Sequence, residues 1–240
     1  MDNMDNMDIT DKNEKIYIII HGFAGGFQEI EPLYDFLSAK GLNVHSILLA
    51  GHGGTRKELK SFSYSDWINS AVKQVKNIKK KYDGETEINL IGFSMGGLIC
   101  ANLTDFFDVQ KIAFVNTPFY FWDLKLITKN IFSDVKHKEY TNINRYVNST
   151  LKSPAKAMIN FLRILRQTKE KFSSVCIKRA NPIILQCIDD DTVQSKSAEI
   201  IKDKIGESAK IIYYETGGHL IFLSETCEQV CNDIYEYLKE

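Results

Sequence analysis

The sequence predicts one α/β domain built on a mainly parallel sheet of about six strands flanked by helices. Three observations predict it: a length of 240 residues with 44% apolar side chains, six short apolar runs, and helical patterns between the runs. A chain of this length and apolar content buries one sizeable core. Strands that alternate with helices are typical of βαβ units and parallel sheets. The expected strands are residues 16–20, 43–49, 87–91, 112–115, 182–188 and 210–214.

The segments between the expected strands carry helical signals. Residues 30–40 precede Gly41, and a glycine at this place is typical of a helix that ends there. Apolar residues recur at helical spacing in two later segments, so both stripes are expected to face the core. The stripes are Trp67, Ala71, Val75, Ile78 and Tyr82 in one helix and Leu223, Cys227, Val230, Ile234 and Leu238 in the last.

Residues 119–180 interrupt this alternation, because they contain helical patterns and no strand run bounded by turns. They are expected to form a small helical cap inserted before the penultimate core strand. Within the cap, Ser153 suits a helix N-cap and Pro154 suits the first helical position. The core is then expected to comprise residues 14–118 and 181–240.

The most specific motif follows the third apolar run. There the sequence Gly92-Phe93-Ser94-Met95-Gly96 places a serine between two glycines, each two positions away. A serine hydroxyl is a poor nucleophile until a base removes its proton, so it must project from a tight turn between strand and helix. Side chains at the two glycine positions would collide across such a turn. A glycine-rich turn also matches this motif by chance, so the prediction depends on two further segments.

One of these segments follows the first apolar run, where residues 21–26 read His-Gly-Phe-Ala-Gly-Gly. Glycines in such a loop let backbone N–H groups point into a cavity. The N–H groups of Phe23 and Met95 are therefore expected to converge as an oxyanion hole, which stabilises the negative oxygen formed during acyl transfer.

The other segment lies in the last third of the chain. His219 follows the last apolar run on a glycine-rich loop, where it is placed to act as a general base. The preceding run leads into three consecutive aspartates, Asp189, Asp190 and Asp191. Of these, the pattern favours Asp190, with Asp191 next, as the carboxylate that orients the imidazole and stabilises the imidazolium.

With these motifs the chain resembles the α/β-hydrolases of the small bacterial carboxylesterase and monoacylglycerol lipase type. The likeness covers nearly the whole chain after the first dozen residues. It implies a serine hydrolase that cleaves short- to medium-chain acyl esters or monoacylglycerols without a cofactor. The implied nucleophile is Ser94, with Asp190 and His219 as its partners and Phe23 and Met95 as oxyanion donors. The motifs that carry the resemblance are His21-Gly22-Phe23, Gly51-His52-Gly53, Asp66-Trp67, Gly92 to Gly97, Asp190 with Val193, and Gly218-His219.

An apolar stripe in a cap ordinarily packs on its own domain. Because a cap lies over the catalytic serine, part of the stripe is also expected to line an acyl-chain pocket. The cap has thirteen Lys and Arg and four Asp and Glu, in a chain of formal net charge −1. Basic helical faces are ordinarily solvated; the alternative is that this one attracts acidic esters or weakly contacts an anionic lipid surface. The predicted pocket residues are Phe119, Phe121, Trp122, Met158, Phe161 and Leu162.

Composition argues against several other classes of protein. Five cysteines without a CxxC pair are interpreted as reduced thiols, and residues 1–13 as a disordered polar tail without the features of a secretory signal. A cytoplasmic protein is therefore expected. No run approaches the roughly 20 apolar residues of a membrane span. No ligand spacing predicts a metal, and no motif predicts nucleic-acid binding. A thioesterase, or a ligand-binding homologue without turnover, remains as an alternative function.

Overall fold

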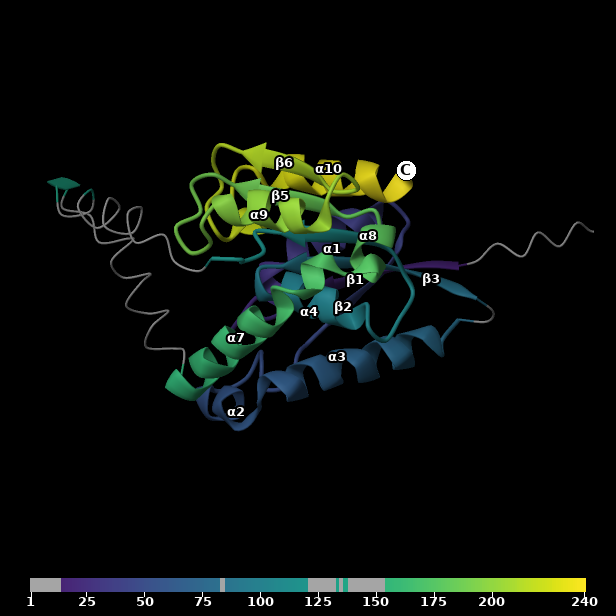
Figure 1. The fold of residues 1–240 in the computed structure, drawn as a ribbon, viewed down its shortest axis with the longest axis horizontal. Coiled ribbons are helices and arrows are strands. Elements are labelled where there is room, and N and C mark those ends of the chain that lie inside the picture. Colours follow the sequence, from purple (N-terminus) through teal and green to yellow (C-terminus); the bar gives the residue numbers. More distant parts are fainter. Residues whose placement is uncertain (1–13, 83–84, 121–132, 134–135, 138–153) are drawn as a thin grey trace, which may run out of the picture.

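The computed structural model describes residues 14–82, 85–120, 133, 136–137 and 154–240. In this part of the chain, six parallel strands form one sheet in the order β2-β1-β3-β4-β5-β6, with helices on both faces (Figure 1). The predicted α/β fold class is therefore confirmed. The strands are β1 (Glu14–Ile20), β2 (Asn43–Ile47), β3 (Thr86–Phe93), β4 (Val109–Val115), β5 (Ile183–Cys187) and β6 (Lys210–Tyr214).

Several strand boundaries differ from the prediction by one to three residues, and the end of the second strand differs for a clear reason. The expected second strand extended to Leu49, but β2 ends at Ile47. The backbone N–H of Leu49 does not join the sheet; it donates a hydrogen bond of 3.1 Å to Nε2 of His21. The imidazole of His21, in the loop after β1, thus accepts the hydrogen bond that the Leu49 N–H would have donated within the sheet if the strand were longer.

Eight α-helices and three short 3₁₀ turns are described. Two helices begin with capping boxes, in which Thr55 with Glu58 and Ser63 with Asp66 satisfy the first free backbone N–H groups. The helices are α1 (Glu31–Ala39), α2 (Arg56–Ser61), α3 (Tyr64–Lys79), α4 (Met95–Leu103), α7 (Ala155–Thr168), α8 (Val175–Arg179), α9 (Lys196–Ile205) and α10 (Cys227–Lys239). The turns are η1 (Phe27–Glu29), η2 (Lys171–Ser173) and η3 (Ile221–Leu223).

The sheet separates two hydrophobic clusters. Alternate residues of β1 enter opposite clusters: Ile18 packs on the side of α3, α4 and α9, and Ile19 packs on the side of α1 and α10. A parallel sheet needs cover on both faces because its strands are apolar throughout. In the chain order, α1 leads from β1 to β2 on one face, and α3 leads from β2 to β3 on the other. The resulting switch point, between β1 and β3, is where sheets of this kind bind ligands, at the carboxyl ends of the strands.

The predicted core stripe of the last helix needs one correction. Val230, Ile234 and Leu238 are buried, as expected, and Cys227 is partly buried. Leu223 is 55% exposed, because it lies in η3, before α10 begins, and so it is not on the helix face that the spacing assumed.

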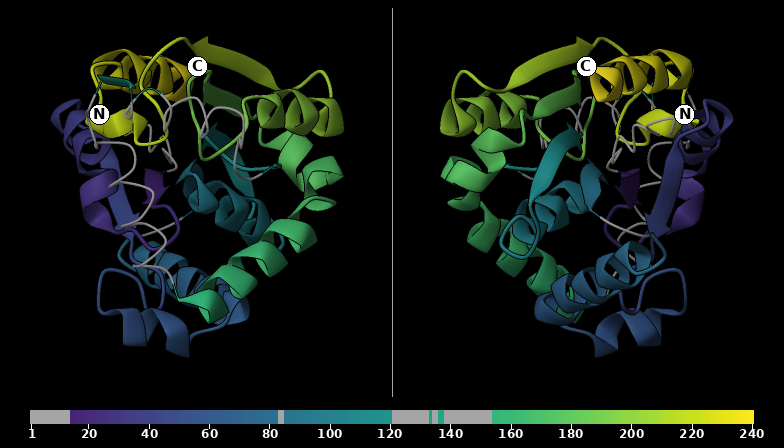
Figure 2. Two further views of the ribbon diagram at one scale, coloured as in Figure 1. Left: turned by 90° about the vertical axis from the view of Figure 1, so that its left-hand side faces the viewer. Right: turned by 90° about the vertical axis from the view of Figure 1, so that its right-hand side faces the viewer.

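The described part of the expected cap packs on the helices of the core. Helix α7 contacts α4, α3 and α2, and Figure 2 shows it extending beside α3 and α2. It begins at Ala155, with Pro154 as its N-cap residue, one position later than the sequence predicted. Ser153 and the expected tail, residues 1–13, lie outside the described residues.

Candidate active site

Ser94 is the single residue between β3 and α4. Its backbone adopts φ +52° and ψ −120°, a conformation that residues with a side chain rarely adopt. Hydrogen bonds hold it on both sides: its N–H donates to the carbonyl of Val115 at 2.8 Å, and its carbonyl accepts from the N–H of Gly97 at 3.0 Å. The sharp turn expected from the sequence is therefore present and is fixed by the neighbouring strand.

Two glycines make this turn possible. A Cβ at Gly92 would overlap the backbone of Gly97, so the strand and the first helical turn approach too closely for any side chain. A Cβ at Gly96 would overlap the carbonyl of Ile20 at the end of β1. The start of α4 consequently lies against the end of β1, which places the loop at residues 21–26 beside Ser94.

The expected oxyanion donors have free N–H groups. In the described chain, neither the N–H of Phe23 nor that of Met95 has a hydrogen-bond acceptor. Met95 is the first residue of α4, where helical N–H groups have no partner within the helix and the helix dipole favours negative charge. The loop that carries Phe23 turns tightly, with Ala24 at φ +57° and the N–H of Gly25 donating to the carbonyl of Gly22 at 3.4 Å.

His21 braces this loop. Its Nε2 accepts from the N–H of Leu49, so its Nδ1 carries the proton that is donated to the carbonyl of Gly22 at 2.8 Å. Burial lowers the pKa of the His21 imidazole to about 4, against the opposing effect of the Gly22 carbonyl. His21 is therefore neutral near pH 7 and acts as a structural bridge between two loops.

His52 lies beside His21 and packs its ring against Trp67 at 5.2 Å between ring centroids. Its Nδ1 donates to the carbonyl of Ala50 at 3.2 Å. Burial, together with the nearby His21, lowers the pKa of His52 to about 3. His52 thus supports the oxyanion loop through its ring contact with Phe23.

Of the three consecutive aspartates, Asp190 is the one whose carboxylate meets the imidazole. Its Oδ2 accepts from Nδ1 of His219 at 2.8 Å, and its Oδ1 accepts from the N–H groups of Thr192 and Val193, both at 2.8 Å. Asp189 accepts from a backbone N–H of the histidine loop, that of Gly218, at 2.8 Å. Asp190 is 1% exposed, so its carboxyl oxygens are satisfied by these donors and not by water.

Asn116, which the sequence analysis did not single out, holds the histidine loop in place. Its Nδ2 donates to the carbonyls of Gly218 and His219 at 3.1 and 3.0 Å, while its Oδ1 accepts from the N–H of Cys187 at 2.9 Å. The residue follows β4 directly and has φ +44°. A polar residue at the carboxyl end of a buried strand is the signal that identifies it.

The ring of His219 packs against Phe93, the neighbour of Ser94, at 5.3 Å between ring centroids. In the described residues there is no hydrogen bond between the Ser94 hydroxyl and the imidazole. Hydrogen bonds of this kind are often long in an unliganded enzyme and tighten when substrate binds. The ring of His219 therefore lies against the residue that precedes Ser94, without a hydrogen bond to the Ser94 hydroxyl in the described residues.

The environment of His219 favours its protonated form. Burial by itself lowers the pKa of the imidazole, but the carboxylate of Asp190, its hydrogen bond and the more distant charges of Glu29 and Asp191 oppose this effect. The net result is a pKa above the ordinary value of 6.5. The ring is thus prepared to accept and hold a proton.

The predicted pocket residues are not equivalent in the structure. Phe161 is buried, and its ring lies 5.1 Å from that of Phe23, beside the oxyanion loop. Met158 is partly buried, whereas Leu162 is 47% exposed on another side of α7. Phe119 is buried and packs on the ring of Phe172. The two other predicted lining residues, Phe121 and Trp122, lie outside the described residues.

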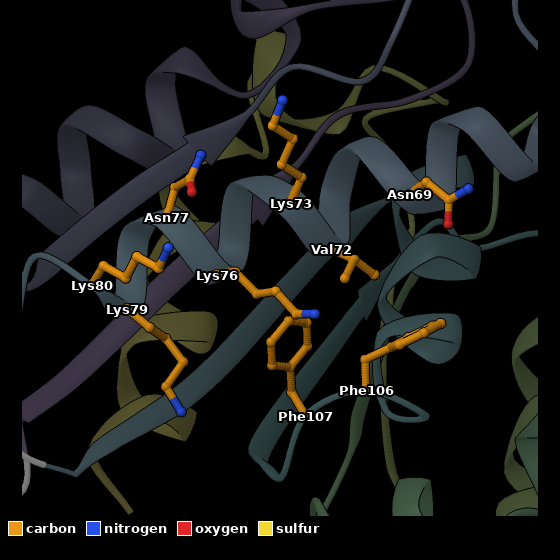
Figure 3. Close-up of a pocket in the computed structure, with 9 residues that line it drawn as sticks. All are labelled: Asn69, Val72, Lys73, Lys76, Asn77, Lys79, Lys80, Phe106 and Phe107. Carbon is orange, nitrogen blue, oxygen red and sulfur yellow. The ribbon is translucent and has the colours of Figure 1, made fainter.

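An open groove of about 700 Å³ lies elsewhere, along the C-terminal half of α3 (Figure 3). It contains none of the predicted site residues and has four lysines among its lining. No group of three or more His, Cys, Asp or Glu in the described ranges is arranged to hold a metal. The groove residues are Asn69, Val72, Lys73, Lys76, Asn77, Lys79, Lys80, Phe106 and Phe107.

Comparison with known proteins agrees with this geometry. A family model of the α/β-hydrolase fold matches residues 17–132. The chain is 22% identical over 231 residues to a carboxylesterase of Bacillus subtilis (strain 168), covering 95% of this chain and 93% of the relative. It is 23% identical over 207 residues to a thermostable monoacylglycerol lipase of Bacillus sp. (strain H-257), covering 81% of this chain and 78% of the relative.

Among solved structures, that of a metagenome-derived lipolytic enzyme superposes with a TM-score of 0.75 at 18% identity, covering 95% of this chain and 94% of the other. The strand order, the serine turn and these likenesses together show the α/β-hydrolase fold. These likenesses confirm the resemblance to small bacterial carboxylesterases and monoacylglycerol lipases that the sequence indicated. In the described part of the chain, no helix combines the length and apolar character needed to cross a membrane.

Proposed function

We propose that this protein is a serine esterase that cleaves short- to medium-chain acyl esters or monoacylglycerols through an acyl-serine intermediate. The observation that carries the proposal is the Asp190–His219 pair beside a serine held in a sharp turn. The free N–H groups of Phe23 and Met95 supply the second requirement, a place for developing negative charge.

In the first half of the reaction the ester carbonyl oxygen faces these two N–H groups. The Ser94 oxygen attacks the carbonyl carbon while its proton moves to Nε2 of His219. Collapse of the tetrahedral intermediate breaks the bond to the alcohol oxygen, which takes the proton from the imidazolium. Each oxyanion donor contributes roughly 2.7–4 kcal/mol to lowering this barrier.

In the second half, water replaces the alcohol. His219 takes a proton from the water as its oxygen attacks the acyl carbon, and then returns that proton to the Ser94 oxygen as the acid leaves. Asp190 stabilises the imidazolium in both halves through its hydrogen bond to Nδ1. The proposed steps use only side chains and backbone N–H groups of this chain, so the proposal involves no cofactor.

Phe161 is proposed to line the acyl site, because its buried ring lies against Phe23 next to the oxyanion loop. Phe119, Phe121, Trp122, Met158 and Leu162 remain predicted lining residues. An apolar wall at this place would bind the acyl chain by removing its surface from water, which stabilises binding by about 0.8 kcal/mol per buried CH₂ group.

The test is labelling by a fluorophosphonate probe, combined with a panel of p-nitrophenyl esters from acetate to palmitate and with monoacylglycerols. The wild-type protein should be labelled and should turn over short or medium esters. Ser94→Ala should lose both, while Ser61→Ala, which changes a serine on the exposed end of α2, should retain both. A wild-type protein that is neither labelled nor active would contradict the proposal and favour a ligand-binding homologue.

Matched acyl thioesters, added to the same panel, test whether the protein prefers esters or thioesters. If matched acyl thioesters are cleaved with a kcat/KM more than about tenfold above that of the oxygen esters, the thioesterase alternative replaces the esterase proposal. The mechanism described above would be unchanged, because the acyl-serine intermediate is common to both.

A further inference from the structure

Glu29 is a second carboxylate near the proposed general base, and it comes from a different element. It ends η1, whereas Asp190 follows β5. We infer that Glu29 is a positioning residue for the proposed ester hydrolysis: it anchors the oxyanion loop by its carboxylate oxygen and stabilises the imidazolium of His219 by its negative charge. The inference rests on the proposed function, but its central measurement does not require turnover.

The contact with the loop is direct. Oε2 of Glu29 accepts a hydrogen bond from the N–H of Gly22 at 3.2 Å, one residue before the oxyanion donor Phe23. The N–H of Glu29 itself donates to the carbonyl of Gly26 at 3.3 Å, so the loop is tied to Glu29 at both ends. A shift of the carboxylate would therefore move the backbone that carries the Phe23 N–H.

The loop is shaped around this carboxylate. A Cβ added to Gly25 would overlap the Glu29 carboxyl group, and one added to Gly22 would lie 3.2 Å from Oε2. The two glycines therefore leave room for the carboxylate inside the turn. Gly25 does not adopt a positive φ. Contact with Glu29 thus explains the glycine at this position better than backbone conformation does.

The electrostatic contact is with His219. The charged groups that favour its protonated form are Asp190, which is hydrogen-bonded to it, and Glu29 and Asp191, which act at longer range. In return, His219 and the Gly22 N–H lower the pKa of Glu29, although burial has the larger effect and leaves that pKa raised. A charge that is poorly solvated acts more strongly on its neighbours than one in water.

The two roles can be separated by substitution. Glu29→Gln keeps an oxygen that can accept from the Gly22 N–H but has no charge. Glu29→Ala loses both the acceptor and the charge. Glu31→Gln is a matched control, because Glu31 is exposed in the first turn of α1 and is not among the groups that act on His219.

The central experiment follows the imidazole of His219 by NMR titration in a Ser94→Ala background, in which no turnover occurs. We expect Glu29→Gln to lower the titration midpoint of His219 by about 0.3 pH unit or more, and Glu31→Gln to leave it unchanged. An identical midpoint in the Glu29→Gln protein would overturn the charge role.

The second readout uses proteins with Ser94 intact. Glu29→Gln should move the acid limb of kcat/KM to lower pH and lower the plateau kcat less than Glu29→Ala does. Glu29→Ala should lower the plateau kcat by about tenfold or more, since the donor loop loses its anchor. If the acid limb of kcat/KM in Glu29→Gln coincides with that of the wild type, the charge role is contradicted. If a folded Glu29→Ala protein has the wild-type kcat, the anchoring role is contradicted.

The failures of the two proposals are distinguishable. Fluorophosphonate labelling of wild-type Ser94 together with indifferent Glu29 variants would refute the role of Glu29 and leave the esterase proposal intact. A wild-type protein without labelling or turnover would refute the esterase proposal and, with it, the catalytic role of Glu29. A lower His219 midpoint in Glu29→Gln would then show only the electrostatic contact.

Discussion

At the scale of single residues, the site depends on a few groups whose neighbours set their protonation. His21 and His219 have the same side chain but opposite shifts, because His21 is buried without a carboxylate while His219 is buried against Asp190. One is neutral and structural near pH 7, and the other is prepared to take a proton. The environment, not the residue type, assigns the two roles.

Replacing Asp190 tests this assignment. Asp190→Asn places an amide N–H toward Nδ1 of His219, which favours the wrong tautomer of the ring, and kcat is expected to fall by about 10⁴-fold. Asp189→Asn is the control, because its amide oxygen can still accept from the Gly218 N–H. Steady-state kinetics on the best ester would measure both. A loss in Asp189→Asn as large as in Asp190→Asn would contradict the assignment.

The pH profile follows from the same residue. His219 must be neutral to accept the Ser94 proton, so kcat/KM should fall as pH drops through the pKa of the folded protein. Sequence alone places this limb near 6.5, the ordinary histidine value; the structure moves it above 6.5 because the surrounding carboxylates raise the pKa. A pH profile of kcat/KM would measure it. A limb centred at or below 6.5 would show that burial outweighs the carboxylates.

At the scale of elements, the proposed site draws its residues from the start of α4 and from the loops after β1, β5 and β6. The close approach of α4 to β1 at Gly96 aligns the Met95 N–H with the loop that carries Phe23. Helix α7 then adds Phe161 to this side of the site. The catalytic groups belong to separate elements, so their alignment depends on how tightly these elements pack.

Gly96→Ala tests the helix–strand approach. The new methyl group would overlap the carbonyl of Ile20, so α4 must shift. We expect the free energy of unfolding to decrease by about 1–3 kcal/mol and kcat to fall. Gly26→Ala is a matched control in the oxyanion loop, since its backbone is extended (φ −169°) and its closest contact is the flexible side chain of Gln28. Urea unfolding of both proteins measures the difference. Equal stability of the two variants would contradict the close approach.

At the scale of the whole molecule, the six-stranded sheet places the switch point between β1 and β3, and Ser94 lies at the carboxyl end of β3. Two buried histidines near this point, His21 and His52, are neutral in the folded protein, so the free energy of unfolding depends on pH. Both bind protons readily when the chain unfolds and are exposed to water, but only at low pH when it is folded.

Stability should therefore fall as the solution becomes acidic. Between pH 6 and pH 5 the unfolded chain protonates His21 and His52, whereas the folded pKa values of about 4 and about 3 keep both rings neutral. The unfolded state then binds more protons, so the free energy of unfolding decreases by about 1.4 kcal/mol per pH unit for each histidine. His219, whose pKa is raised, contributes stability that is lost as pH rises through that pKa. Urea titrations at pH 7, 6 and 5 would measure the slope, and a flat profile would contradict it.

Local signals in the sequence predicted the six strands and the serine turn. Apolar runs predict strands directly. Glycine is required at positions 92 and 96 because the backbone turns too sharply around Ser94 to leave room for a side chain there. The sequence could not predict that Asn116 holds the histidine loop or that Glu29 acts on His219, because in both cases the partners are about a hundred residues or more apart. Such contacts exist only after the sheet has assembled.

What the sequence by itself determined was the order of the strands along the chain and the residue types that ester chemistry needs. Only the tertiary structure decided which aspartate meets His219, that Phe161 is buried against Phe23 while Leu162 is exposed, and which histidines stay neutral. The physical reason is that periodicity and turn propensity act between near neighbours. Burial, charge and hydrogen bonding at the site join residues that are far apart in the chain.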